Sequence, residues 1–339
     1  MSIRFPAEWE PQSATLLAWP YEGSDWDPVL RYVQNTYRQI IAAARQYQPV
    51  VLLVPDDDLI EDEFWLPVEG VHPVHILNLP YDDTFVRHCG PLTVHSGTAP
   101  MWADFRFDGL GGRYFRPRDA EMVSALTASG LFHHLNTICH PWVLEGGAVE
   151  SDGAGTLMTT SRCLGRRVSR FTRRDWEEQL KRALGAERVL WLDHGELLGE
   201  DNDGHVDTLA RFADPDTIIY QGCRRPEDPH YPFLCAMADQ LRGFRNTRHQ
   251  RYDLIELPLP AAPATGETPV PASYASFAIL NDAVLMPTFN DPENDPIAVR
   301  IIERAFPGRT VVPIDSRVLV SRGSGIHSAT LQLPLGVLT

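Results

Sequence analysis

The sequence predicts an α/β protein, and two observations support this prediction. Short apolar runs typical of strands alternate with amphipathic stretches typical of helices along the whole chain of 339 residues. No break in composition separates these units, so a single domain over residues 1–339 is expected. From the residues alone, this alternation favours a doubly wound parallel sheet.

The expected strands are short and are bounded by turn residues. Val50–Val54 is an uninterrupted apolar run closed by Pro55, which is typical of a fully buried strand. Phe277–Leu280 and Ala283–Met286 flank Asn281-Asp282, a pattern that predicts a β-hairpin. The other expected strands are Thr15–Trp19, His75–Leu79, one near Val143, one near Leu157, Val189–Leu192, Thr217–Tyr220, Leu254–Leu257 and Thr310–Val312.

The expected helices follow from apolar residues at helical spacing. Val29–Arg45 repeats apolar side chains three or four residues apart. The helix expected over Arg174–Leu184 is preceded by Thr172, and Asp175 three residues later resembles a capping box. Pro258–Pro271 contains five prolines and is expected to be a surface loop. The remaining expected helices are Asp119–Ser129, Phe233–Thr247 and Pro296–Phe306.

Composition and charge narrow the class of partner. A hydrophobic fraction of 43% and a charged fraction of 22% are ordinary for a globular protein. The net charge of −15 disfavours nucleic acid and anionic membranes as partners, and it suits a small cationic molecule. No apolar run reaches the length of a membrane span, and Met1–Pro6 carries no apolar signal segment, so we expect a cytoplasmic protein.

The five cysteines do not form a recognisable framework. None belongs to a CxxC pair, and an odd number in such a chain argues against structural disulfides. Most of them are expected to be small buried apolar side chains.

Two acidic segments carry residues suited to catalysis. In the segment 203–207, His205 and Asp207 lie two residues apart, which places both on one face if the segment is a strand. An imidazole there could move protons while the carboxylate holds a cation, although a plain turn with a satisfied histidine explains the same pattern. Glu145 lies between an apolar run and Gly146-Gly147, which is an unusual environment for a solvated carboxylate.

Two further segments complete the candidate set. Residues 82–91 pack charged side chains beside Cys89 and a Gly-Pro turn, and a polar loop accounts for them equally well. The glycine-rich run 323–334 contains His327 and Ser328. A serine next to a histidine in sequence is weak evidence for nucleophilic catalysis, because catalytic partners are usually distant along the chain.

Taken together, these segments resemble the agmatine deiminase and bacterial peptidylarginine-deiminase family, a guanidine-modifying family. The resemblance begins at Pro6-Ala7-Glu8-Trp9-Glu10-Pro11 and continues through Asp104–Phe107, Leu144–Glu150 and Gly204–Phe212. It ends in the tail at Leu333-Pro334, so it covers essentially the whole chain. It implies the pentein fold, a five-bladed α/β propeller of ββαβ-type modules with pseudo-fivefold symmetry around a central active site.

The resemblance also implies a reaction and a set of residues. In this family of C–N hydrolases a cysteine thiolate attacks the guanidinium carbon, a histidine protonates the departing ammonia, and water releases a ureido product. Agmatine deimination of this kind belongs to putrescine biosynthesis. No cofactor or metal is implied. The positions that match are Ser328, His205, Glu145 and Asp207 for catalysis, and His88, Phe85, Asp82, Arg87 and Gly325 for substrate binding.

Two positions depart from the family pattern. Ser328 stands where the family has its nucleophilic cysteine, and His88 stands where the motif Arg-Asp-x-Gly-Pro has a guanidinium-binding aspartate. Phe85 replaces the usual tryptophan. A serine hydroxyl is far less acidic than a thiol and needs a positioned base, so Ser328 is expected to be a poor substitute. Loss of a carboxylate at position 88 removes a charge-assisted contact with guanidinium.

Four hypotheses follow. The first is a diverged member with an altered ligand or altered chemistry. The second is an active guanidine or amidine hydrolase, with Ser328 working through His205 or with Cys89 as nucleophile; a Cys-to-Ser substitution that traps substrate belongs here. The third is a metal site that uses His88, His205, Glu145 and Asp207. The fourth is a non-catalytic scaffold or sensor, and homo-oligomer formation stays open.

Overall fold

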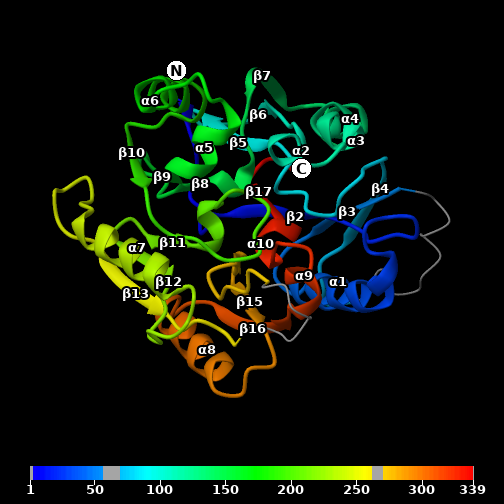
Figure 1. The fold of residues 1–339 in the computed structure, drawn as a ribbon. Helices are drawn as coiled ribbons and strands as arrows, with labels where there is room; N and C mark the ends of the chain where they lie inside the picture. Colours follow the sequence, from blue (N-terminus) through cyan, green and yellow to red (C-terminus); the bar gives the residue numbers. More distant parts are fainter. Residues whose placement is uncertain (1–2, 56–68, 262–269, 339) are drawn as a thin grey trace.

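The computed structural model describes residues 3–55, 69–261 and 270–338 as a mixed α/β fold (Figure 1). Within these residues the strands form five separate sheets of three or four strands. The strands are β1 (Ile3–Arg4), β2 (Gln12–Ala18), β3 (Val50–Val54), β4 (Val74–Asn78), β5 (Leu92–Ser96), β6 (Ala99–Arg106), β7 (Asn136–Val143), β8 (Val149–Ser151), β9 (Thr156–Thr160), β10 (Arg188–Leu192), β11 (Ala210–Asp214), β12 (Thr217–Gln221), β13 (Asp253–Leu257), β14 (Ala278–Ile279), β15 (Ala283–Thr288), β16 (Thr310–Asp315) and β17 (Leu331–Pro334).

Helices connect the strands and lie mainly on the outside of the molecule (Figure 1). The α-helices are α1 (Leu30–Ala44), α2 (Gly109–Gly112), α3 (Pro117–Ala120), α4 (Met122–Ala128), α5 (Ser161–Arg167), α6 (Arg173–Leu184), α7 (Tyr231–Gly243), α8 (Asn294–Ala305), α9 (Arg317–Val320) and α10 (Ile326–Ala329). Short 3₁₀ helices occupy Asp27–Val29, Gly146–Ala148 and Val206–Thr208.

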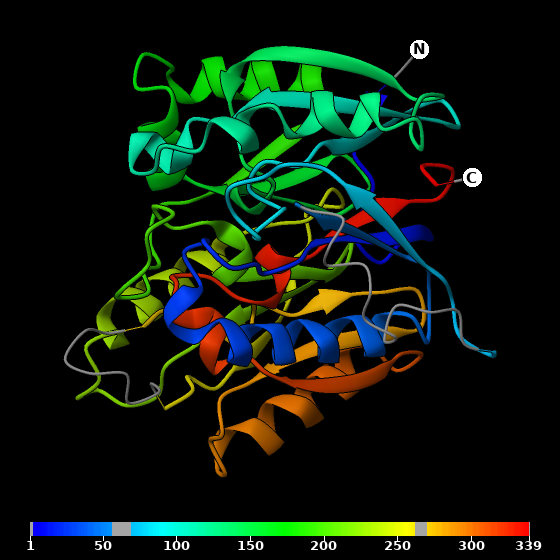
Figure 2. The same ribbon diagram turned by 90° about the vertical axis from the view of Figure 1, so that its right-hand side faces the viewer.

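One strand–strand–helix–strand order recurs in all five sheets. Two antiparallel strands are followed by a helix and then by a strand parallel to the second one. The pairs β5–β6, β8–β9, β11–β12 and β14–β15 are followed by β7, β10, β13 and β16. The remaining sheet takes its first strand, β17, from the C-terminus and pairs it with β2, so both chain ends lie on one side of the molecule (Figure 2).

Each of these sheets buries one apolar face under its own helix. Tyr37 and Ile40 on α1 belong to the same apolar cluster as Leu52 on β3, and all three are fully buried. The helices α4, α6, α7 and α8 pack in the same way on the sheets that contain β6, β9, β12 and β15. Burial of apolar area at about 25 cal/mol per Å² is the main stabilising contribution in such cores.

Most expected elements are confirmed, with shifts at their ends. The run Val50–Val54 is a strand with the predicted bounds, and the capping box of Thr172 and Asp175 is present. The helix expected to reach Thr247 ends at Gly243. The doubly wound parallel sheet favoured by the residues alone is wrong, because each helix returns the chain to a small sheet opened by an antiparallel pair.

The proline-rich segment 258–271 lies only partly within the described residues. Residues 262–269 fall outside them, and the flanking residues 258–261 and 270–271 belong to neither helix nor strand. Over the described ranges, every helix is too short or too polar to cross a lipid bilayer.

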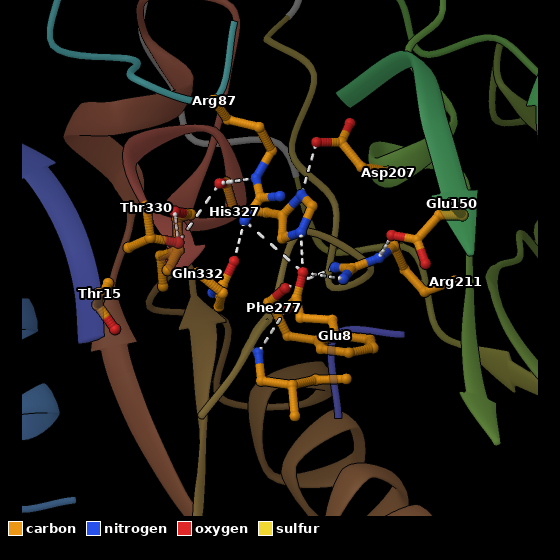
Figure 3. A network of polar contacts seen from close by, with 12 residues as sticks. Glu8, Thr15, Arg87, Glu150, Asp207, Arg211, Phe277, His327, Thr330 and Gln332 are labelled. Carbon is orange, nitrogen blue, oxygen red and sulfur yellow. Dashed lines mark hydrogen bonds and ion pairs between the residues drawn. The ribbon is translucent and has the colours of Figure 1, made fainter. Parts of the chain in front are cut away.

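A buried arginine joins three of the sheets to the N-terminal segment. Arg211 on β11 forms ion pairs with Glu150 on β8 and, at 3.0 Å, with Glu8 (Figure 3). It also donates to the carbonyl oxygen of Phe277 at 2.7 Å, next to β14. Its side chain is fully buried. Burial alone would lower the pKa of Arg211, but the two carboxylates outweigh it and raise that pKa.

Removal of Arg211 is expected to destabilise the whole fold. Arg211→Met leaves Glu8 and Glu150 without their shared cation, and loss of one partner from a buried ion pair typically costs about 3–5 kcal/mol. Arg174→Met on α6 is the matched control, because its pair with Glu178 is largely exposed and such pairs are worth less than about 1 kcal/mol. Denaturant unfolding of both variants checks this, and equal losses of stability would contradict it.

Candidate active site

Four chain segments that are distant in sequence bring the candidate residues together. They are the turn that carries His88, the residue before the 3₁₀ helix 146–148, the 3₁₀ helix 206–208, and α10. His205 precedes the helix that contains Asp207, so these two residues do not lie on a strand and the shared strand face does not apply to them. The 3₁₀ turn nevertheless buries both side chains completely.

His88 lies against His205 in the interior. The two rings meet edge to face with centroids 5.3 Å apart, and the ring of Phe85 lies 5.6 Å from His88 on another side. Only 3% of His88 is exposed. Burial and the neighbouring His205 lower the pKa of His88 to about 3, so its imidazole is neutral near pH 7.

Glu145 holds a buried ion pair beside His205. Its Oε1 accepts a hydrogen bond from Arg167 Nε at 2.5 Å, while Oε2 lies 3.6 Å from His205 Nε2. Burial raises the pKa of Glu145, but His205 and Arg167 outweigh burial and lower it. Arg167 in turn donates to Asp203 at 2.7 Å, so its guanidinium bridges two carboxylates. Glu145 is therefore a carboxylate with one oxygen committed and one facing His205.

Asp207 belongs to a second carboxylate network. His327 lies between two acidic side chains, with Nδ1 2.7 Å from Asp207 Oδ2 and Nε2 2.6 Å from Glu8 Oε2 (Figure 3). Burial raises the pKa of Asp207, but the hydrogen bond and charge of His327 outweigh it and bring that pKa to about 2. Glu8 connects this network to Arg211.

Ser328 lies on α10 next to His327, and its side chain is fully buried. Its hydroxyl shares a hydrogen bond of 2.5 Å with the hydroxyl of Ser324. Within the described part of the chain, no histidine is bonded to that hydroxyl. Gly325 at the start of α10 has to be small, because a Cβ there would overlap Ser276 Oγ. Ser328 is thus held on α10 beside His327, with its hydroxyl paired to another neutral hydroxyl.

Gly147 shows how closely these side chains gather. A Cβ at that position would lie 2.6 Å from His205 Nδ1 and 2.7 Å from Asp207 Oδ2.

The cluster contains several buried polar atoms without a hydrogen-bond partner in the described structure. They are both ring nitrogens of His88 and of His205, Oε2 of Glu145, Oδ1 of Asp207 and Oγ of Ser276. Buried polar groups are normally paired, so this concentration indicates a place that a bound molecule completes.

A cavity of about 220 Å³ leads to this cluster. Phe85 and His88 line it, whereas Glu145, His205, Asp207 and Ser328 are completely buried and are absent from its wall. Its charged lining is largely paired, and Arg116 contacts Asp25 and Asp83 at 2.8 and 3.2 Å. His88 therefore stands between the cavity and the deeper residues. The other lining residues are Trp26, Leu110, Tyr114, Gly199, Asp201, Ser321, Arg322 and Gly323.

Two candidate binding residues lie apart from this cluster. Asp82 accepts a hydrogen bond from the backbone of Arg118, and its neighbour Asp83 lines the cavity instead. Arg87 donates to the carbonyl oxygen of His327 at 2.6 Å and lines a different cavity of about 60 Å³. Its charge supports the network around Glu8.

Several site residues were missed by the sequence analysis. Arg167 and Ser276 carry no local signal, because they meet Glu145 and Gly325 only through the fold. Asp203 belongs to the same segment as His205, but the sequence analysis did not single it out. Its left-handed backbone (φ 64°) beside Gly204 is visible only in the structure.

Cys89 is not a replacement nucleophile in this structure. Its side chain is buried in an apolar core, and burial raises the pKa of its thiol well above the usual value. A thiol held in its protonated form is unreactive. Cys89, Cys163 and Cys223 are buried as expected, whereas Cys139 is exposed and Cys235 is half-buried.

The side chains proposed as metal ligands are not arranged as a metal site. His88, His205, Glu145 and Asp207 do not form a common ligand group within the described residues; Glu145 and His205 instead approach Cys163, and Glu8 and Glu150 approach His327. Glu145 is already paired with Arg167, and burial raises the pKa of the Cys163 thiol well above its usual value. A protonated thiol beside a guanidinium does not suit a cation.

The Asp207–His327 contact predicts a pH-dependent contribution to stability. Because the pKa of Asp207 is lower in the folded protein than the usual value near 4, the contribution is present above about pH 4 and is lost as the pH falls towards 2. Asp207→Asn is expected to cost about 2 kcal/mol or more at pH 7 and less at pH 3. Denaturant midpoints at both pH values measure this, with Asp239→Asn on the surface as the control. A pH-independent cost would contradict it.

Comparison with known proteins finds relatives in one family of deiminases. The family model of the Porphyromonas-type peptidyl-arginine deiminase matches residues 4–334. A Legionella pneumophila protein provisionally named an agmatine deiminase is 30% identical over 337 residues, covering 97% of this chain and 94% of that protein.

Two solved structures are also similar. A Porphyromonas gingivalis protein provisionally named an arginine deiminase has 38% identity and a TM-score of 0.93, covering 99% of this chain and 100% of that one. A C. jejuni agmatine deiminase, a cysteine-to-serine variant with substrate bound, has 28% identity and a TM-score of 0.91, covering 98% and 96%. The chain therefore belongs to the Porphyromonas-type peptidyl-arginine deiminase family.

Proposed function

We propose that the protein binds a guanidine-type or closely related planar nitrogen-rich head group at this cluster, without catalysing ordinary deimination. The observation that carries the binding proposal is the concentration of buried, unpartnered polar atoms on His88, His205, Glu145 and Asp207. Family membership supports a ligand of this class. The cysteine-to-serine variant of the C. jejuni relative holds its substrate, which supports binding after the loss of a cysteine.

The surroundings of Ser328 support the loss of ordinary turnover. A serine nucleophile needs a base within about 2.6–3.2 Å, but the hydroxyl of Ser328 is bonded to another neutral hydroxyl, that of Ser324. His205 can carry a proton, but neither of its ring nitrogens is hydrogen-bonded to the hydroxyl of Ser328. It is therefore not placed to take the hydroxyl proton. Attack on a guanidinium carbon therefore has no activated nucleophile.

The wider context of the proposal follows from the family. We propose that the five sheets are the blades of one α/β propeller domain over residues 1–339, with the cluster near its centre. Placement of α10 near the middle of the molecule supports this arrangement (Figure 1). A link to polyamine metabolism is a proposal that rests on the resemblance, and a cytoplasmic location is a proposal that rests on the lack of long apolar runs in the sequence.

The first test is a product assay. Agmatine, free arginine and an arginine peptide are each incubated with the protein, and the ureido product is measured against the Enterococcus faecalis agmatine deiminase assayed in parallel. We expect turnover at least about 10³-fold lower than that enzyme, because the activated nucleophile is missing. Turnover within tenfold of the comparison enzyme would contradict the proposal.

The second test restores the two altered positions. In the double variant Ser328→Cys with His88→Asp, we expect turnover of one of these substrates to rise at least about 10²-fold over the wild type. The matched control is Ser324→Cys with His88→Asp, which adds a buried thiol four residues away and is expected to give no gain. No gain in the first variant, with both proteins folded, would contradict a family-type pocket.

A further inference from the structure

The imidazole of His88 changes what the pocket can hydrogen-bond. A neutral imidazole presents one donor and one acceptor, whereas the aspartate of the family motif presents acceptors only and carries a negative charge. His88 is 3% exposed, and both of its nitrogens are buried without a partner. Because burial and His205 lower its pKa to about 3, it has this neutral form near pH 7.

Most carboxylates around the site already have a charged partner, whereas Asp201 at the cavity wall accepts a hydrogen bond from the neutral hydroxyl of Tyr114. Glu145 is paired with Arg167, and one oxygen of Asp207 is taken by His327. At the cavity wall, Asp25 and Asp83 both contact Arg116. In the family pattern the aspartate at position 88 would supply an additional negative charge. Without it, a guanidinium that loses its water on entering the site meets one negative charge fewer than the family pattern provides.

The hydrogen-bond pattern points in the same direction. A guanidinium carries only donors, so it can use the acceptor nitrogen of His88 but leaves the imidazole N–H unpaired in a dry site. An unpaired buried donor costs about 1–3 kcal/mol. A ureido or carboxamide head group has a carbonyl oxygen that accepts from that N–H. Its own N–H groups can still donate to Oε2 of Glu145 and Oδ1 of Asp207, the two carboxylate oxygens left unpaired.

We infer that this pocket selects a neutral ureido or carboxamide head group over the matching guanidinium, and that His88 is the residue that sets this preference. The inference rests on the proposed function, because it requires that the cluster binds a planar head group at all. It assigns to the pocket the type of head group that ordinary deimination produces.

Matched ligand pairs test this directly. Citrulline and arginine differ only in the ureido or guanidinium head, as do N-carbamoylputrescine and agmatine. Isothermal titration calorimetry of the full-length protein with all four ligands at pH 7.5 is expected to show at least about tenfold tighter binding of the ureido member of one pair. The use of two pairs separates the contribution of the head group from that of the rest of the ligand.

Three variants assign the preference to His88. His88→Asp restores a negatively charged side chain that only accepts hydrogen bonds. It is therefore expected to bind the guanidinium member of a pair about tenfold or more tightly than the ureido member. His88→Asn stays neutral and retains one acceptor and a donor, so it is expected to keep the ureido preference. His140→Asp adds the same charge on β7, outside the residues that line the cavity, and is expected to change neither affinity. Circular dichroism confirms that each variant folds.

The possible failures are distinguishable. Tighter binding of the guanidinium member by the wild type, or no reversal in folded His88→Asp, overturns the inference and leaves the proposed function in place. If none of the four ligands binds the wild type at millimolar concentration, the proposed function fails together with the inference.

Discussion

The site depends on a buried network of charges centred on Glu8, Arg211 and His327. Arg211 connects the carboxylates of Glu8 and Glu150, and Glu8 holds one side of the His327 ring while Asp207 holds the other. These contacts join the N-terminal segment, the sheets that contain β8 and β11, and α10 (Figure 3). Buried charges are tolerable only when they are paired, so this network fixes the position of α10, and with it that of Ser328.

Around that network lie the residues that the family resemblance assigns to catalysis and to substrate binding. Glu145, His205 and Asp207 are buried ionisable groups of one cluster, while the hydroxyl of Ser328 is bonded to that of Ser324. His88 adds a neutral donor between the cavity and the deeper residues. We propose that the two departures from the family pattern act in one direction: both weaken covalent chemistry on a guanidinium, while the buried acceptors stay available to a planar head group.

Local patterns predicted much of the fold but little of its arrangement. Val50–Val54 and the capped helix at Thr172 depend on neighbouring residues, so their positions could be read directly. The pairing of β17 with β2 joins opposite ends of the chain, and no local pattern indicates it. Likewise, His205 and Glu145 could be singled out from motifs, whereas the Arg167 that completes Glu145 lies 22 residues away on a helix and meets it only after folding.

The most direct measurement is a crystal structure of the unmodified protein with citrulline bound. The account predicts a ureido head group whose carbonyl oxygen accepts from His88 and whose nitrogens donate to Glu145 and Asp207, with Ser328 unmodified. A ligand bound elsewhere, or a head group attached covalently to Ser328, would contradict it.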